Sequence, residues 1–205
     1  MIARPRVLRL LAGLWLLAGG GVVLRSEIRL SKVDADRMQS KLVLITQFAE
    51  ASPRARPLSR STAITEPEVN SYLRFSIADL IPTGVVEPYI TIVGDGRLAG
   101  RALVDLDAVR NQKDRGWLDP IGHLSGRLPV TLSGILHARD GAARFDLESA
   151  QIAGVPVPKF VLQELVSHYT RTAEKPGGLG LDDTFELPAG IREIRVGRGE
   201  AIVVQ

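Results

Sequence analysis

The sequence predicts an α+β fold, in which a curved antiparallel β-sheet built from hairpins wraps around or packs on amphipathic helices. Turn-forming residues at Gly94-Asp95-Gly96 and Asp140-Gly141 each separate two β-rich runs and predict two hairpins. Apolar residues recur with a helical period in Lys159–Arg171 and predict a helix that covers the sheet. With 205 residues, 45% of them hydrophobic, the chain is long enough to bury a core.

The hairpin around Asp140-Gly141 has the clearest pattern, because apolar and polar residues alternate strictly on both sides of the turn. Such alternation is typical of a sheet with one buried face and one face in water. The apolar positions are Leu128, Val130, Leu132, Gly134, Leu136, Ala138, Ala143, Phe145 and Leu147. Small residues among the large ones predict a concave or bent face, and packing against a helix explains them equally well.

The remaining elements follow from shorter patterns. Apolar residues at steps of three and four predict a helix over Ser31–Ala49. Thr65 and Glu68 form a capping box, which predicts a second helix from Thr65 to about Phe75. The other expected elements are a strand at Ser59–Ile64, hairpin strands at Val85–Val93 and Leu98–Leu106, a short helix or loop at Asp107–Asp114, and a last hairpin of Ile191–Val196 and Ala201–Val204.

The N-terminus has the pattern of a secretory signal or a signal anchor, and the sequence does not separate the two. Arg4, Arg6 and Arg9 precede an uncharged run whose apolar members are Leu10, Leu11, Leu14, Trp15, Leu16, Leu17, Val22, Val23 and Leu24. The positive-inside rule then predicts a periplasmic or extracytoplasmic protein attached to the cytoplasmic membrane. A buried N-terminal core helix is the alternative. The expected parts are 1–25 (signal or anchor), 26–58 (amphipathic helix and linker) and 59–205 (α+β domain).

The charge of the chain gives no indication of a nucleic-acid partner. The formal net charge is +3, but removing the three N-terminal arginines leaves 23 basic residues against 23 acidic ones. Phosphate recognition requires a concentrated basic face, and the sequence contains no such run. The absence of cysteine rules out disulfides and thiol chemistry.

Catalytic and metal-binding motifs are not recognisable, so we expect a non-enzyme without a cofactor or a metal. Ser125 lacks the spacing of a nucleophile elbow, and the three histidines lack the spacing of metal ligands. Asp105 and Asp107, two residues apart on one strand face, suggest either a cation site or a solvated strand end. Gly94, Gly96 and Gly100 do not match the dinucleotide-binding pattern and precede a strand.

The candidate functional residues are therefore apolar. They are expected to line a groove between sheet and helix, and the competing interpretation is an ordinary packed core. The residues are Val104, Leu106, Leu132, Leu136, Phe145, Leu147, Val161, Leu165 and Tyr169. Only 5% of the residues are aromatic, so the lining is aliphatic, which suits an acyl chain and plain packing alike.

Three stretches resemble YpmS-like and mycobacterial LmeA-like bacterial envelope proteins. They are the helix start Thr65–Leu73, the passage Asp140–Val161, and Leu187–Ile191 before the final hairpin. The resemblance implies half of a tubular lipid-binding (TULIP-like) fold, with a helix in a curved sheet that encloses an apolar channel. It carries over no catalytic residue. Asn70 matches the family asparagine, and its expected role is a polar contact from the helix surface to a neighbouring loop.

Three functions remain open at this point. The first is binding of a lipid or other long apolar ligand, for lipid transfer or envelope assembly. The second is a structural or scaffold subunit of an envelope complex with a filled core, which adds a partner strand at an exposed edge such as Ala201–Val204. The third is a hydrolase with an unrecognised site, against which the missing motifs weigh.

Overall fold

The computed structural model describes residues 29–51, 59–110, 126–171 and 175–205, without the side chains of Val109, Arg110, Leu165, His168 and Tyr169. It confirms an α+β protein with antiparallel sheets. The predicted anchor residues between Leu10 and Leu24, and residues 52–58 of the predicted helix-and-linker part 26–58, lie outside the described residues. The helices are α2 (Lys32–Glu50), α3 (Glu66–Phe75), the 3₁₀ helix η1 (Ala78–Leu80), α4 (Leu106–Arg110) and α5 (Lys159–Tyr169). The strands are β1 (Ser61–Thr65), β2 (Val85–Gly94), β3 (Arg97–Asp105), β4 (Arg127–Arg139), β5 (Ala142–Ile152), β6 (Val155–Pro156), β7 (Phe185–Glu186), β8 (Glu193–Val196) and β9 (Glu200–Val204).

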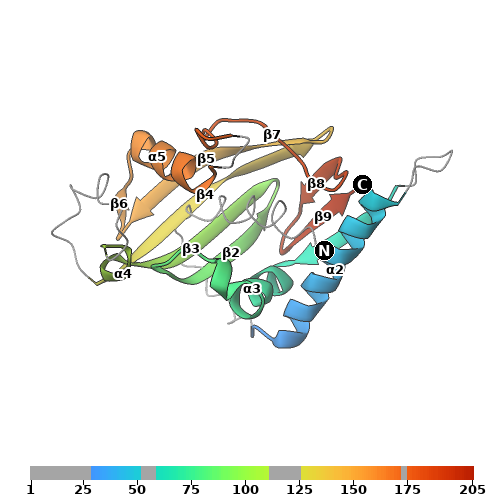
Figure 1. Ribbon diagram of the computed structural model, residues 1–205, viewed down its shortest axis with the longest axis horizontal. Helices are drawn as coiled ribbons and strands as arrows, with labels where there is room; N and C mark the ends of the chain where they lie inside the picture. The colour runs from blue at the N-terminus through green and yellow to red at the C-terminus, as the bar shows by residue number, and fades with distance from the viewer. Residues whose placement is uncertain (1–28, 52–58, 111–125, 172–174) are drawn as a thin grey trace.

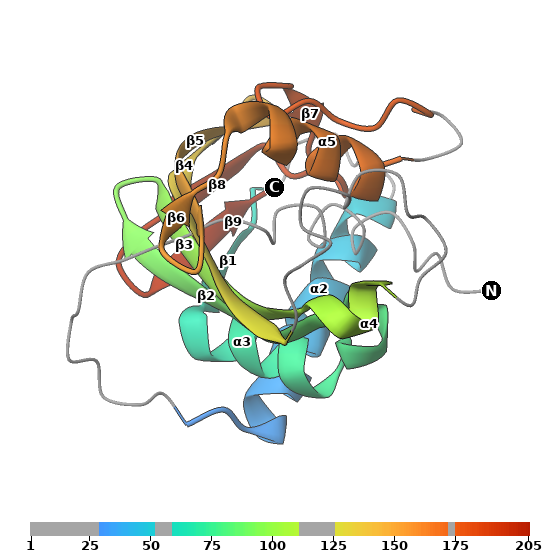
Figure 2. The ribbon, with the colours of Figure 1, turned by 90° about the vertical axis from the view of Figure 1, so that its left-hand side faces the viewer.

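The strands form two antiparallel sheets (Figure 1). The larger sheet has the order β2-β3-β4-β5-β6, with β7 paired to the start of β5. The smaller one has the order β1-β9-β8 and lies beside α2. Figure 2 shows the larger sheet bent into a trough with α5 on its inner side.

Successive side chains along each strand of the larger sheet point to opposite faces. Residues directly opposite each other on neighbouring strands point to the same face, so the strand register shows which residues each face carries. The inner face, which α5 covers in part, carries Leu98, Leu132 and Phe145. The outer face carries polar residues such as Arg101, Thr131 and Gln151, which are aligned across three strands. The two central hairpins therefore confirm the pattern of one apolar and one wet face.

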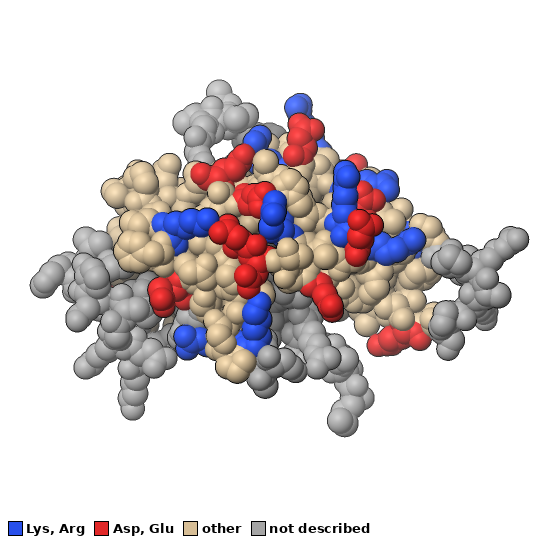
Figure 3. All heavy atoms as spheres, turned by 90° about the horizontal axis from the view of Figure 1, so that it is seen from above, with Lys and Arg blue, Asp and Glu red and all other residues tan. Residues whose placement is uncertain are grey.

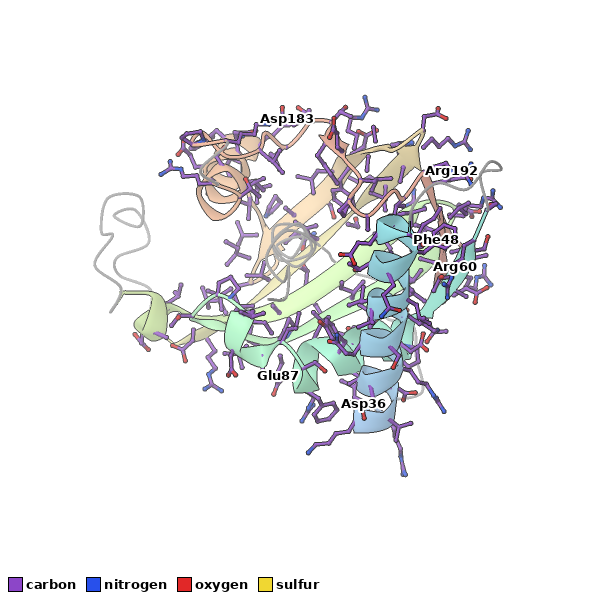
Figure 4. The ribbon with its side chains drawn as sticks, turned by 45° about the vertical axis from the view of Figure 1, so that its right-hand side comes forward. Asp36, Phe48, Arg60, Glu87, Asp183 and Arg192 are labelled. Carbon is purple, nitrogen blue, oxygen red and sulfur yellow. The ribbon has the colours of Figure 1, made fainter. Side chains whose placement is uncertain are left out.

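Two hydrophobic cores hold the fold together. The α5 core joins the inner face to α5, and its buried members are Leu132, Phe145, Ala150, Leu162, Val166 and Leu181. The α2/α3 core joins both helices to the smaller sheet, and its buried members are Met38, Ile45, Ile64, Tyr72, Leu73, Ile77, Ile191 and Val203. At the end of α2, Phe48 lies beside Arg60 (Figure 4), with the guanidinium carbon 5.9 Å from the ring centroid.

The start of α3 is the capping box that the sequence predicts. The Thr65 amide donates to Glu68 Oε2 at 2.8 Å, and the Glu68 amide donates to Thr65 Oγ1 at 3.5 Å. Lys41 Nζ, from α2, contacts both Glu68 oxygens at 2.6 and 2.7 Å and the Ala63 carbonyl at 2.6 Å. The Glu68 carboxylate thus links the start of α3 to Lys41 of α2, and Lys41 in turn binds the Ala63 carbonyl of β1.

We expect this ion pair to make stability depend on pH. Burial opposes ionisation of Glu68, but hydrogen bonds from Lys41 and Thr65 outweigh it and lower the pKa of the carboxyl. The resulting stabilisation is complete above the ordinary glutamate pKa of about 4.3 and is lost as the pH falls through the lowered folded value. The gap in unfolding free energy between wild type and Glu68→Gln should therefore shrink from pH 7 to pH 3, as measured by urea denaturation. A gap that is constant or widens toward acid would contradict this assignment.

Two expectations about strand ends are wrong. Ala201–Val204 does not form an exposed edge, because β9 lies between β1 and β8 and pairs with both. Asp105 and Asp107 do not share a strand face, because β3 ends at Asp105 and Leu106 begins α4. Asp105 Oδ1 instead accepts from the Ala108 amide at 3.1 Å, and Asp107 accepts from the Gly126 amide at 3.0 Å. Each carboxylate thus accepts a hydrogen bond from a different backbone amide.

Candidate apolar binding face

Four of the predicted groove residues lie in the α5 core or against it. Leu132 is 2% exposed and Phe145 is 8% exposed, and both belong to the same buried cluster as Leu162 and Val166 of α5. Leu136 and Leu147 are half-buried and pack against the same cluster. The protein's own side chains surround these four residues, which favours the packed-core interpretation at these positions.

The other five predicted residues are spread more widely. Leu106 is buried at the first position of α4, and Val104 is half-buried at the end of β3. Val161 is half-buried in the first turn of α5. The side chains of Leu165 and Tyr169 lie outside the description. The structure therefore does not bring all nine residues together in one lining.

A different set of apolar residues shares one end of the inner face, where β2 begins and β3 ends. Val85 is opposite Val104, which is opposite Leu128, so the three form one row. A second row runs from Ala102 through Val130, Ile152 and Val155 to the edge of the sheet. We call Val85, Ala102, Val104, Leu128 and Ile152 the apolar end of the inner face.

The residues of the apolar end are all half-buried. Within the described part of the chain, none of them belongs to the α5 core or to the α2/α3 core. Sequence analysis identified only Val104 as a site residue. Alternation placed Leu128 on the apolar face, but nothing in the sequence shows that it lies in one row with Val104 and Val85.

Charged groups border the apolar end without entering either row. Arg127 Nε donates to Asp105 Oδ2 at 3.2 Å, where β4 begins and β3 ends. The amide of Ala108, followed by the Arg127 guanidinium, lowers the pKa of Asp105 by hydrogen bonding to its ionised form. This carboxylate therefore stays charged and paired at neutral pH. A polar or ionic ligand finds no group to bind within the two rows.

Several charged side chains of the outer face are paired with one another or with an aromatic ring. Arg101 stacks over Tyr89 at 4.8 Å, and Arg97 makes a bidentate pair with Glu148 at 2.8 Å. Arg144 and His137 both contact Asp146. Figure 3 shows acidic and basic side chains side by side on the surface seen from above. Such alternating charge does not form the single-sign patch that phosphate recognition requires.

Asn70 has a different role from the one predicted. It is 0% exposed, and it binds the edge strand β2 rather than a loop. Its Nδ2 donates to the carbonyls of Ile90 at 2.7 Å and Glu66 at 2.9 Å, and its Oδ1 accepts from the Ile90 amide at 2.7 Å. Glu66 continues the contact by accepting from the Ile92 amide at 2.8 Å and the Tyr89 hydroxyl at 2.9 Å. Two side chains of α3 therefore satisfy backbone groups that an edge strand would otherwise leave open.

Comparisons with known proteins identify no relative. A scan against family models found no matching family, and searches of curated proteins and of solved structures found no significant match. The resemblance to YpmS-like and LmeA-like proteins stays a prediction. No helix within the described ranges is both long enough and apolar enough to cross a membrane. The same residues contain no group of three or more His, Asp or Glu side chains placed to hold a metal ion.

Proposed function

We propose that this protein binds a single long aliphatic chain, such as the acyl chain of a lipid, across the apolar end of its inner face. The observation that carries the proposal is the in-register pair of apolar rows, in which the five residues of the apolar end are half-buried and belong to neither core. Because every residue in the two rows is aliphatic, the rows would bind a ligand by hydrophobic contact alone. An acyl chain meets that condition because it offers no hydrogen-bonding groups along its length.

The dimensions of the rows suit such a ligand. Neighbouring strands lie about 4.8 Å apart, so a row over three strands spans about 10 Å and a row over four spans about 14 Å. Each methylene removed from water contributes about 0.8 kcal/mol before the cost of ordering the chain. Several methylenes in contact with the rows therefore give useful affinity without a polar anchor.

The setting that we propose is the outer side of a cytoplasmic membrane. The N-terminal pattern of arginines followed by an uncharged apolar run supports export or anchoring. A lipid-binding module at that place would take part in lipid transfer or envelope assembly, with no chemical step of its own.

A photoactivatable fatty acid tests the ligand site directly. The full chain is incubated with diazirine-labelled palmitate, irradiated and digested with trypsin, and the modified peptides are mapped by mass spectrometry. We expect adducts in peptides 102–110 and 128–139, which carry Ala102, Val104 and Leu128. Peptide mapping separates this site from labelling of the N-terminal run. Adducts confined to residues 1–24 would refute the proposal.

Two tryptophan variants of β3 sharpen the test. Val104→Trp places a large side chain on the inner face and is expected to reduce the adducts several-fold by filling the apolar end. Leu103→Trp is the matched control, because Leu103 is also half-buried but points to the outer face, opposite Pro129. Equal loss of adducts in both variants would indicate general disruption rather than a filled site.

A scaffold role is the second candidate, and the filled α5 core around Leu132 and Phe145 favours it. In that case no adduct forms in either peptide, and the protein works through its surface. The segment Ala201–Val204 does not provide that surface, since β9 is already paired on both sides.

A further inference from the structure

Two exposed apolar side chains lie a few residues apart in the sequence, Val155 in β6 and Phe160 in the first turn of α5. Phe160 is 72% exposed and Val155 is 65% exposed, more than any other large hydrophobic residue in the described ranges. They are five residues apart, with Pro156 and Pro158 between them. We call the segment 153–160 the apolar tip.

The backbone holds the apolar tip in place. Ala153 and Gly154 both have positive φ, at 50° and 80°, and form a tight turn between β5 and β6. The Val157 amide donates to the Ala150 carbonyl at 3.0 Å, and the Val157 side chain packs against the α5 core. The prolines fix φ on either side of that contact. The exposure of Phe160 and Val155 is therefore built into a braced segment.

The apolar tip continues the apolar end of the inner face. Val155 pairs with Ile152, which is opposite Val130, so the second row ends at the tip. An aliphatic path thus runs from Ala102 across the sheet to its exposed margin. A chain bound on the inner face would reach the outside at this point.

We propose that the apolar tip inserts into the surface of a lipid bilayer and turns the apolar end toward it; this rests on the proposed ligand site. The area of the tip favours a bilayer over a protein partner. An aromatic side chain buries at most about 250 Å², whereas a stable protein interface takes about 800 Å² from each partner. Val155 and Phe160 alone bury too little area for a protein interface, but two apolar side chains suffice for shallow insertion into the interfacial region of a bilayer.

The charge at the tip predicts the kind of surface that it enters. Lys159 Nζ lies 2.8 Å from Asp182, and both side chains are largely exposed, so the positive charge next to Phe160 is compensated. Apolar contact, rather than attraction to anionic headgroups, should therefore drive insertion. We expect it to occur on neutral phosphatidylcholine and to change little with salt.

The absence of cysteine allows a site-specific test in the full chain. Phe160→Cys and Val155→Cys are labelled with a polarity-sensitive nitrobenzoxadiazole dye and reconstituted into phosphatidylcholine vesicles with or without nitroxide-labelled lipid. Val93→Cys is the matched control, because Val93 is also an exposed valine but lies at the opposite end of β2 from the apolar end. We expect several-fold stronger quenching at positions 160 and 155 than at 93. Equal quenching at the three sites would overturn the proposal.

The outcome is separable from that of the fatty-acid experiment. Quenching at the tip without adducts in peptides 102–110 and 128–139 would support membrane insertion and refute ligand binding. Adducts without quenching at the tip would support the ligand site and refute insertion. Quenching that appears only with phosphatidylglycerol and disappears in 0.5 M salt would overturn the apolar mechanism, because a Debye length of about 4 Å screens exposed charges.

Discussion

Replacing Gly134 by alanine is expected to destabilise the protein by about 2–4 kcal/mol, because strand β4 has no room for a side chain there. A Cβ built at Gly134 would lie 2.6 Å from Cε1 and Cζ of the Phe145 ring and even closer to the Asp146 carbonyl oxygen. The Phe145 ring packs in the α5 core, so it cannot move aside without disturbing Leu132 and α5. The Asp146 carbonyl belongs to the paired strand β5 and is equally fixed.

Gly100→Ala is the matched control for this prediction. Gly100 lies on the same inner face in the adjacent strand, yet a Cβ there meets only the Tyr89 carbonyl at 3.5 Å, which is an ordinary contact. We expect a change within about 0.5 kcal/mol, and alanine's lower chain entropy favours the folded state. Urea denaturation of both variants measures the difference. Similar losses at the two positions would show that the Phe145 ring does not require the glycine.

Replacing Asn70 by alanine is expected to cost about 3–5 kcal/mol, because the buried edge of β2 loses its partner. The change removes three hydrogen bonds and leaves the amide and carbonyl of Ile90 without the Asn70 side chain. Alanine is the better helix former by a few tenths of a kcal/mol, so the loss is net of that gain. Hydrogen exchange gives a local readout, in which the Ile90 amide should lose protection before the centre of the sheet does.

Gln39→Ala is the control for Asn70, since it removes an exposed amide side chain from helix α2. Its effect should stay within about 0.5 kcal/mol. Asn70→Asp tests the loss of hydrogen bonds without a loss of side-chain volume. It keeps the acceptor for the Ile90 amide but removes the donor to the Ile90 carbonyl. We expect it to be destabilised as well. A stable Asn70→Ala variant with full protection at Ile90 would contradict the proposed clamp on β2.

Sequence patterns correctly predicted those features whose structure depends only on residues close together in the chain. The Asp140-Gly141 turn joins β4 and β5 with positive φ at both residues, as the dipeptide predicts. The Thr65 capping box forms between residues three apart, so its geometry is set within one helical turn. Helix α5 begins at Lys159, immediately after the proline that ends the extended segment.

Sequence patterns did not predict which distant segments pair with one another. Nothing in the pattern of Ala201–Val204 shows that β1, about 140 residues earlier, covers its free edge. The same holds for Asn70, whose polar side chain suggests a helix surface until the edge of β2 is placed against it. Sequence reasoning also treated Val104 and Leu132 alike, although only Leu132 is buried in a core.

The sequence by itself determined the longer helices, the hairpin strands, the two faces of the central hairpins and the aliphatic nature of the candidate site, but not β6, β7 or η1. It did so because hydrophobic period, turn residues and caps act over a few residues along the chain. Only the tertiary structure decided which apolar positions α5 fills, which ones remain half-buried at the apolar end, and which strand edges are covered. Burial of these positions and coverage of these edges depend on strand register and on helix placement. Both bring together residues that are far apart in the chain, and a local sequence pattern contains no information about their contacts.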